Sequence, residues 1–196
     1  VNDEVVHGIP GPRVLREGDV VSVDTGCSVN GWCGDSAITH PVGTVSVEAQ
    51  RLLDCTSGTL ALAIRLVGTR NRWSDVAAEM AKYVRDHGFS VVENFVGHGI
   101  GRSMHEDPQV PNFCTPAFRK NHDFELEPGV VIAVEPMVNM GTKKVRALAD
   151  HWTQATVDGL PSAHFEHTVA ITEGGVVVLT APPAAGETVG NAGSAA

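Results

Sequence analysis

The chain has 196 residues and a formal net charge of −9, with 42% hydrophobic and 19% charged residues. These values are typical of a single soluble globular domain. The acidic balance argues against a general nucleic-acid binder, which would need a basic face. No run of about 18 apolar residues is present, so no membrane-spanning helix is predicted. The printed residues show no secretory leader, and four cysteines without a CxxC pair indicate reduced thiols in the cytosol.

The first informative segment is a predicted hairpin with strands at 19–29 and 32–42. Its turn, Asn30-Gly31, is the strongest short hairpin signal and suits a type I′ turn. In the register that this turn sets, Asp24 and Asp35 are diagonal neighbours on one face. Their backbones are then roughly 7–8 Å apart, which lets both carboxylates reach a common ion. The sequence therefore predicts a cation site on the hairpin, with two solvated surface aspartates as the alternative.

The next segments are predicted to be structural. A helix over 46–67 has its apolar side chains at helical spacing. A second helix runs from Asp75 to His87, with Ser74 as the expected N-cap and Gly88 as the stop. A strand is expected over 90–96. The proline-rich segment at 108–116 is expected to be irregular.

Three histidines lie in glycine-rich surroundings. His7 opens the loop 7–12, which also holds two glycines and two prolines. His98 and His105 lie in the stretch 96–108, where glycines before and after His98 let the backbone approach a bound group closely. Taken singly, each histidine is more often a structural residue than a ligand.

Two glutamates fall inside apolar strands. Glu135 interrupts the predicted strand 130–138 and is followed by Pro136, while Glu166 lies in the predicted strand 163–172. Further short strands are expected at 143–148, 152–157 and 176–179. An ionised glutamate in an apolar strand is costly unless it is paired. Because the chain has only 14 lysines and arginines, a metal is an attractive partner.

These side chains together form a candidate ligand set of one imidazole and four carboxylates. Its members are Asp24, Asp35, His98, Glu135 and Glu166. Four converging carboxylates would repel one another, and two divalent ions relieve that repulsion. The donors suit Mn, Fe, Co or Zn, among which the sequence does not choose. Two such ions activate a bridging water against a carbonyl, so the implied reaction is hydrolysis of an amide, with a nearby imidazole handling protons.

A series of motifs runs through the chain in a fixed order. The series is Val5-Val6-His7-Gly8-Ile9-Pro10, Val23-Asp24, Gly34-Asp35, Gly97-His98-Gly99-Ile100-Gly101, His105-Glu106-Asp107-Pro108, Val134-Glu135-Pro136-Met137 and Phe165-Glu166-His167-Thr168. It resembles the motif series of the type I methionine aminopeptidases, from Asn2 to about Leu179. The resemblance implies the α+β pita-bread fold, in which an antiparallel sheet flanked by helices surrounds a dinuclear metal site.

The resemblance also implies a role for each ligand. Asp24 is expected to bind one metal ion, and Asp35 and Glu166 to bridge both. His98 and Glu135 are expected to bind the other ion. Glu135 would also pass on the proton of the attacking water.

Other residues are placed around the substrate by the same resemblance. His105 is expected to contact the scissile amide, and His7 to lie near the second residue of the substrate. Trp152 corresponds to the mouth of the pocket, and Met104 to a pocket-lining position. A weaker correspondence places Asn2 and Ser162 near a monovalent-cation site.

The activity that the resemblance implies is removal of the N-terminal methionine from nascent proteins whose second residue is small. A water or hydroxide bridging the metals would attack the first peptide bond. We expect a cytoplasmic monomer that acts near the ribosome, without membrane or direct nucleic-acid binding. Residues 1–181 would form the catalytic domain and 182–196 a disordered tail. Because family members carry several dozen residues before the His7 motif, we expect an N-terminal segment to be missing.

Two alternatives remain open at this point. One is a proline-specific dipeptidase or aminopeptidase of the same fold, which would share the five ligands. The other is a non-catalytic pita-bread protein that binds a partner and has lost its metals. The His7 loop, the His105 segment and Trp152 favour the methionine enzyme over the first, and the complete ligand set argues against the second.

Overall fold

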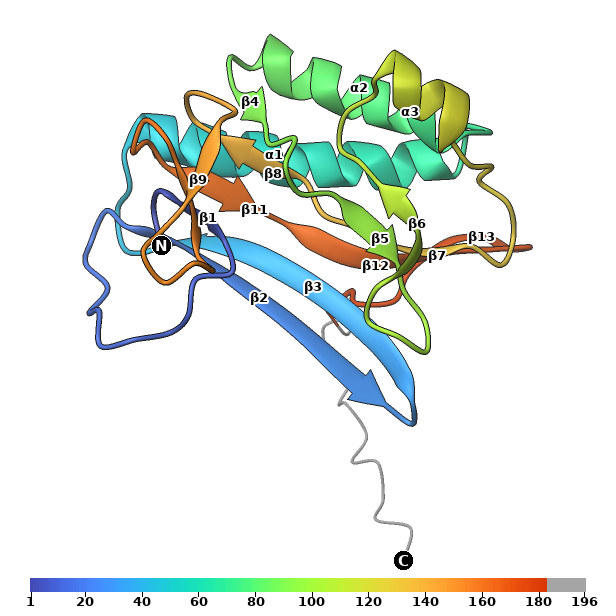
Figure 1. The fold of residues 1–196 in the computed structure, drawn as a ribbon, viewed down its shortest axis with the longest axis horizontal. Helices are drawn as coiled ribbons and strands as arrows, with labels where there is room; N and C mark the ends of the chain where they lie inside the picture. Colours follow the sequence, from blue (N-terminus) through green and yellow to red (C-terminus); the bar gives the residue numbers. More distant parts are fainter. Residues whose placement is uncertain (183–196) are drawn as a thin grey trace, which may run out of the picture.

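The computed structural model of the chain describes residues 1–182. Apart from its first residue, the predicted tail 182–196 lies outside the described part. The described residues form an α+β structure in which three helices lie along one side of antiparallel sheets (Figure 1). Within residues 1–182, no helix combines the length and hydropathy needed to cross a membrane.

The sheets are built entirely from antiparallel pairs. The strands are β1 (Glu4–Val6), β2 (Val20–Val29), β3 (Trp32–Pro41), β4 (Ser90–Val91), β5 (Gly97–Gly99), β6 (Glu106–Val110), β7 (Val131–Val134), β8 (Met137–Asn139), β9 (Val145–Ala147), β10 (Gln154–Thr156), β11 (Ser162–His164), β12 (Glu166–Thr172) and β13 (Gly175–Val178). The largest sheet has the order β2-β3-β12-β7-β5-β6, and β13 pairs with β12. Two smaller sheets have the orders β1-β10-β9 and β11-β8-β4.

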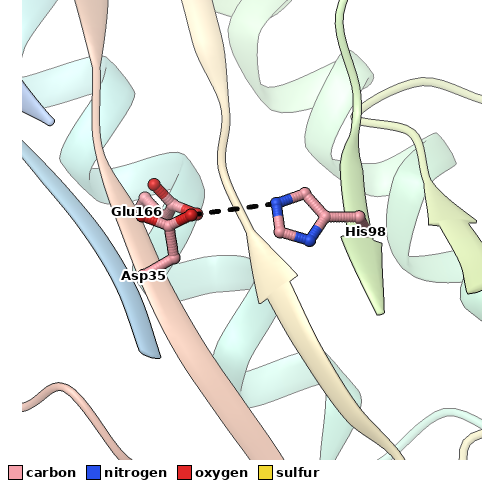
Figure 2. Close-up of side chains that lie close together, drawn as sticks. All are labelled: Asp35, His98 and Glu166. Atoms are coloured by element: carbon pink, nitrogen blue, oxygen red, sulfur yellow. Dashed lines mark ion pairs between the residues drawn. The ribbon is translucent and has the colours of Figure 1, made fainter. Parts of the chain in front are cut away.

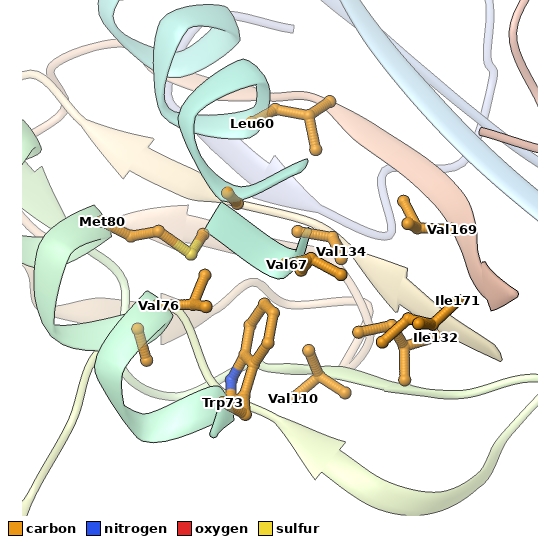
Figure 3. Packing of buried hydrophobic residues seen from close by; sticks show 12 residues of the cluster. Leu60, Val67, Trp73, Val76, Met80, Val110, Ile132, Val134, Val169 and Ile171 are labelled. Atoms are coloured by element: carbon orange, nitrogen blue, oxygen red, sulfur yellow. The ribbon is translucent and has the colours of Figure 1, made fainter. Parts of the chain in front are cut away.

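The predicted first helix is confirmed as α1 (Val47–Val67). It begins after Ser46, whose hydroxyl accepts a hydrogen bond from the Ala49 N–H, and it ends at Gly68. The side chains on its inner face pack with those of α2 (Trp73–Asp86) against the large sheet (Figure 3). The buried cluster includes Leu60, Val67, Trp73, Val76, Met80, Val110, Ile132, Val134, Val169 and Ile171.

The predicted start of the second helix is wrong. Helix α2 begins at Trp73, and Ser74 is a buried residue of its first turn rather than the N-cap. The cap comes from a distant carboxylate instead, because Asp123 Oδ1 accepts a hydrogen bond from the Ser74 N–H at 2.9 Å. The other oxygen of Asp123 accepts from Arg72 Nε at 2.8 Å. Sequence spacing did not reveal this cap because its donor and acceptor are far apart in the chain.

The segment around the glycine-rich stretch also differs from expectation. The predicted strand 90–96 shrinks to β4. The segment expected to be irregular begins with the second part of β6 and ends where the short helix α3 (Pro116–Asn121) starts. Strand β6 approaches β5 closely because β5 ends in a glycine: a Cβ on Gly99 would overlap the Asp107 carbonyl oxygen of β6. The predicted strand 163–172 is likewise divided at Phe165 into β11 and β12.

We predict that Asp123→Ala lowers the free energy of unfolding by about 1–2 kcal/mol at neutral pH, because the mutation removes the cap. Burial raises the pKa of the Asp123 carboxyl, but hydrogen bonds from Arg72 and Ser74 outweigh it and hold this pKa below its ordinary value of 3.8. The stabilisation is therefore present above pH 3.8 and is lost as pH falls through the lower folded value. Urea denaturation at about pH 6 and about pH 3 measures the difference between the two proteins.

Glu125→Ala provides the matched control. Glu125 also contacts Arg72, at 3.2 Å, but its side chain is 68% exposed. Such an exposed pair contributes about 0–1 kcal/mol, so this variant should unfold almost as the parent does. Equal losses in both variants, or a loss in Asp123→Ala that is the same at both pH values, would contradict the capping account.

Candidate metal centre

The register predicted for the hairpin is confirmed. Asp24 pairs with Ala37, and Gly26 pairs with Asp35 across β2 and β3. The two aspartates are therefore diagonal neighbours on one face of the hairpin. Asp35 is half-buried, whereas the Asp24 side chain is 40% exposed. The hairpin thus presents two carboxylates to one cavity.

Threonine hydroxyl groups join the hairpin to β12 and to β11. Glu166 pairs directly with Ala37, and direct pairing ends one residue later. Beyond that point, Thr168 Oγ1 lies 2.9 Å from both the N–H and the carbonyl oxygen of Asp35. On the other side, Thr39 Oγ1 bridges the N–H and the carbonyl oxygen of His164 at 2.8 Å each. These bonds hold Asp35 and Glu166 at a fixed separation.

Glu135 is positioned by the interruption that the sequence predicted. It follows β7 directly, and Pro136 separates β7 from β8. Its backbone carbonyl oxygen accepts a hydrogen bond from Asn112 Nδ2 at 3.0 Å. The chain therefore leaves the sheet at the point where the glutamate side chain enters the cavity.

His98 lies in the middle of β5, opposite Ala133 of β7. Its Nδ1 is 2.9 Å from the Gly99 carbonyl oxygen. A carbonyl oxygen can only accept, so Nδ1 carries the hydrogen and Nε2 presents a lone pair to the site. Nε2 lies 4.0 Å from Asp35 Oδ2 and 3.6 Å from Glu135 Oε1. A lone pair that faces carboxylate oxygens in this way favours a cation between them.

The five candidate ligands are spread over five neighbouring strands of the large sheet. Asp24, Asp35, Glu166 and His98 lie on β2, β3, β12 and β5, and Glu135 directly follows β7, which lies between β12 and β5. Figure 2 shows Asp35, His98 and Glu166 facing one another, and one ligand atom from each lies within 4.8 Å of the other two. The structure thus brings together the residues that the sequence analysis selected.

The electrostatics of Glu166 indicate that a cation belongs here. The residue is 2% exposed, and among residues 1–182 its Oε1 has no hydrogen-bond partner. Burial, followed by the charges of Glu135, Asp35 and Asp24, raises the pKa of its carboxyl from 4.5 to about 10. A divalent cation would both satisfy the oxygen and offset the repulsion, so the donors fit a metal centre.

The ligands line a cavity of about 160 Å³. In the described chain no lysine or arginine lines it; the remaining lining residues are Val6, His7, Phe95, Val96, His105 and Met137. A larger cavity of about 890 Å³ shares His7 and Asp24 with it and also includes Trp152. The smaller cavity is therefore a polar centre that adjoins an apolar groove.

The other two predicted histidines lie at the rim of the cavity. His105 is exposed, and its ring centroid is 4.3 Å from that of His98. His7 has a positive φ of 64°, and its ring lies 5.4 Å from Trp152 and 5.6 Å from Phe95. This backbone conformation is uncommon outside glycine and is held here between two aromatic rings. Both histidines are accessible to a molecule bound over the ligands.

The structure also places Met104, expected to line the pocket, and Asn2 and Ser162, expected near a monovalent cation. Met104 does not line the small cavity; its Cε would lie 2.6 Å from a Cβ built on Gly26. The Asn2 amide donates to Asp19 Oδ1 and accepts from the Val20 N–H, and the Asn2 carbonyl accepts from the Ser162 N–H. Asn2 and Ser162 are thus neighbours, and the Asn2 side chain is engaged within the protein.

Sequence reasoning missed His164. Its side chain is 2% exposed and lies between Asp24 and Glu135, with Nδ1 4.0 Å from Asp24 Oδ2 and Nε2 3.5 Å from Glu135 Oε2. The alternation of the predicted strand already placed it on the same face as Glu166. Strand alternation could therefore have identified His164 as a neighbour of the candidate ligands, but the sequence analysis gave it no role.

Comparisons with known proteins agree with this arrangement. The family model described as "Metallopeptidase family M24" matches residues 1–173. Methionine aminopeptidase 1 of Bacillus subtilis is 48% identical over 180 residues, which cover 92% of this chain and 71% of that protein. The crystal structure of a methionine aminopeptidase from Thermotoga maritima has a TM-score of 0.87 at 43% identity, covering 92% of this chain and 72% of that one.

A dipeptidase structure from Pyrococcus horikoshii matches with a TM-score of 0.69 at 21% identity, covering 89% of this chain and 42% of that one. This similarity shows the shared fold alone. The comparisons confirm the expected pita-bread fold, and the matches to methionine aminopeptidases are much higher in identity. The chain belongs to metallopeptidase family M24 and, within it, to the methionine aminopeptidases.

Proposed function

We propose that this chain cleaves the N-terminal methionine from new polypeptides whose second residue is small. The observation that carries the proposal is the buried carboxylate of Glu166, which has no hydrogen-bond partner among the described residues and faces the other candidate ligands. Membership of a methionine aminopeptidase family supports metal-dependent removal of methionine as the activity.

The metal centre would hold two divalent ions, of Mn, Fe, Co or Zn. Asp35 and Glu166 lie on paired strands at the middle of the ligand row, which suits carboxylates shared by two ions. Asp24 would complete one ion's ligands, and His98 and Glu135 those of the other. When bound, such ions lower the pKa of water and act as Lewis acids toward a carbonyl oxygen.

The protein's own residues would then handle the proton and the substrate. Glu135, half-buried beside His98, would take the proton of the attacking water, as the family resemblance implies. His105 at the rim would donate a hydrogen bond to the scissile amide and stabilise the charge that develops there. His7, packed against Trp152, would contact the second residue of the substrate.

The remaining features of the proposal rest on resemblance. Nascent chains expose their first residue near the ribosome, so we place the enzyme there, in the cytoplasm, as a monomer. A proline-specific peptidase, the alternative that the sequence left open, shares this fold. It is supported only by similarities such as the 21% match to the dipeptidase, which concern the fold.

The choice between these two activities is tested with peptides. The protein loaded with manganese should release methionine from Met-Ala-Ser and leave Ala-Pro intact, because the family resemblance predicts a methionine site. Amino-acid release is followed by chromatography, with protein treated with a chelator as the control. Preference for Ala-Pro would overturn the assignment, and cleavage of neither peptide would favour the non-catalytic alternative.

We predict that Glu166→Gln abolishes tight divalent-metal binding in calorimetric titrations and yet stabilises the metal-free protein. The folded pKa of Glu166, about 10, exceeds its ordinary value of 4.5, so metal-free wild type loses stability as pH rises between these values. Glutamine stays neutral, and its advantage should therefore grow between about pH 5 and about pH 8 in the presence of chelator. A metal-free variant that is less stable than the parent at both pH values would refute this electrostatic account.

Replacing His105 should impair turnover without affecting metal binding. We expect His105→Gln to lower kcat on Met-Ala-Ser by roughly 10²–10⁴-fold, because a positioned imidazole contributes about that much to catalysis. Manganese affinity should stay at the parent value, since His105 is exposed at the rim. His122→Gln, an exposed histidine next to α3, is the matched control and should leave both values unchanged. Full activity in His105→Gln would remove this residue from the mechanism.

A further inference from the structure

We infer that His164 is a positioning residue that holds the Glu135 carboxylate in the orientation required by the metal centre. The inference rests on the proposed function, because His164 would act by holding a ligand of the same metal centre. His164 belongs to β11, which pairs with β8 in a small sheet next to the large one. It therefore reaches the ligands from a different sheet.

The position of the His164 ring is fixed by its backbone. Thr39 Oγ1 bonds to both the N–H and the carbonyl oxygen of His164 at 2.8 Å. Thr39 Oγ1 also lies 2.8 Å from Ser22 Oγ on β2. Because these bonds tie β11 to both strands of the hairpin, the imidazole is held at a defined distance from Asp24.

The ring itself is buried between two candidate ligands. His164 is 2% exposed, and among the described residues its Nε2 has no hydrogen-bond partner. A buried polar atom without a partner is unfavourable. The group facing this nitrogen is Glu135 Oε2 at 3.5 Å, and Nδ1 lies 4.0 Å from Asp24 Oδ2. The imidazole is therefore directed toward the metal centre.

The two oxygens of Glu135 face two different histidines. Oε1 lies 3.6 Å from His98 Nε2, and Oε2 lies 3.5 Å from His164 Nε2. A neutral His98 ring, the form that binds a metal, uses its single N–H on the Gly99 carbonyl, so its Nε2 has no hydrogen to donate to Glu135. Of the two histidines, only His164 can hold the carboxylate by donating a hydrogen bond. Oε1 is thereby left to share a metal with His98, a division typical of outer-layer hydrogen bonds at metal sites.

The test compares variants that differ only in what they present to Glu135. His164→Leu keeps the bulk but has no donor, and His164→Asn is polar but too short to reach. His164→Gln carries an amide N–H on a longer side chain. Manganese affinity and stoichiometry are measured by calorimetry and by electron paramagnetic resonance, and kcat and KM on Met-Ala-Ser at saturating manganese.

We expect His164→Leu and His164→Asn to weaken manganese binding by about 10–100-fold at unchanged stoichiometry. At saturating manganese, kcat should fall and KM should stay near the parent value, because the base is misplaced and the substrate pocket is intact. His164→Gln should recover most of the affinity and of kcat. A role in packing alone would not be rescued in this way.

His167→Leu is the matched control. His167 is one residue beyond Glu166 on β12, but its Nδ1 bonds to Thr180 Oγ1 and it does not line the cavity. Its replacement should lower the Tm and leave manganese affinity unchanged.

Three results would overturn the inference. They are parent-like manganese binding in both His164→Leu and His164→Asn, a His164→Gln variant no better than those two, and the loss of one bound ion, which would make His164 a ligand. A parent protein that binds no manganese would instead overturn the proposed function, and the inference with it.

Discussion

Four carboxylates that meet in one cavity, without a lysine or arginine among the described lining residues, are the constraint on which this structure depends. Burial and mutual repulsion raise the pKa of Glu166 to about 10 in the absence of a cation. A protein that keeps such a cluster must either protonate it or neutralise it with metal ions. The local geometry favours metal ions, because the tautomer of His98 is fixed so that a lone pair enters the same space.

The large sheet brings the candidate ligands together. Four of five adjacent strands each hold one candidate ligand, and Glu135 directly follows the fifth, β7, although the strands are scattered from residue 20 to residue 172 in the sequence. Threonine hydroxyls continue the contact of β3 beyond its direct pairing with β12, through Thr168 of β12 on one side and from Thr39 to β11 on the other. Helices α1 and α2 pack a dense apolar core against the other face of this sheet, so the ligand row lies on a rigid support. The carboxylates are thus held close together by strand pairing and by packing that the rest of the chain provides.

The features that the sequence predicted correctly are set by residues close together in the chain. The register that places Asp24 and Asp35 follows from the Asn30-Gly31 turn, whose chemistry requires no knowledge of the rest of the fold. Glu135 and Glu166 were conspicuous because each interrupts an apolar run. Similarly, α1 carries its own start and stop signals. These features were predicted from residues a few positions apart.

What the sequence did not reveal depends on contacts between distant segments. The cap of α2 comes from Asp123, about fifty positions away, so Ser74 was an incorrect choice. His164 could not be given a role until β11 was known to lie against the hairpin, since only that packing directs its ring at Glu135. The pairing of β5 with β6 likewise depends on the close approach of the Asp107 carbonyl of β6 to Gly99. Long-range strand pairing is the information that local patterns lack.

The central claim is that the cavity is a metal centre built from Asp24, Asp35, His98, Glu135 and Glu166. The most direct measurement is anomalous X-ray scattering from a crystal of the full chain grown with manganese. The account predicts two anomalous peaks in the small cavity, one contacting Asp24, the other contacting His98 and Glu135, and both contacting Asp35 and Glu166. Manganese bound elsewhere, with no peak among these five residues, would contradict it.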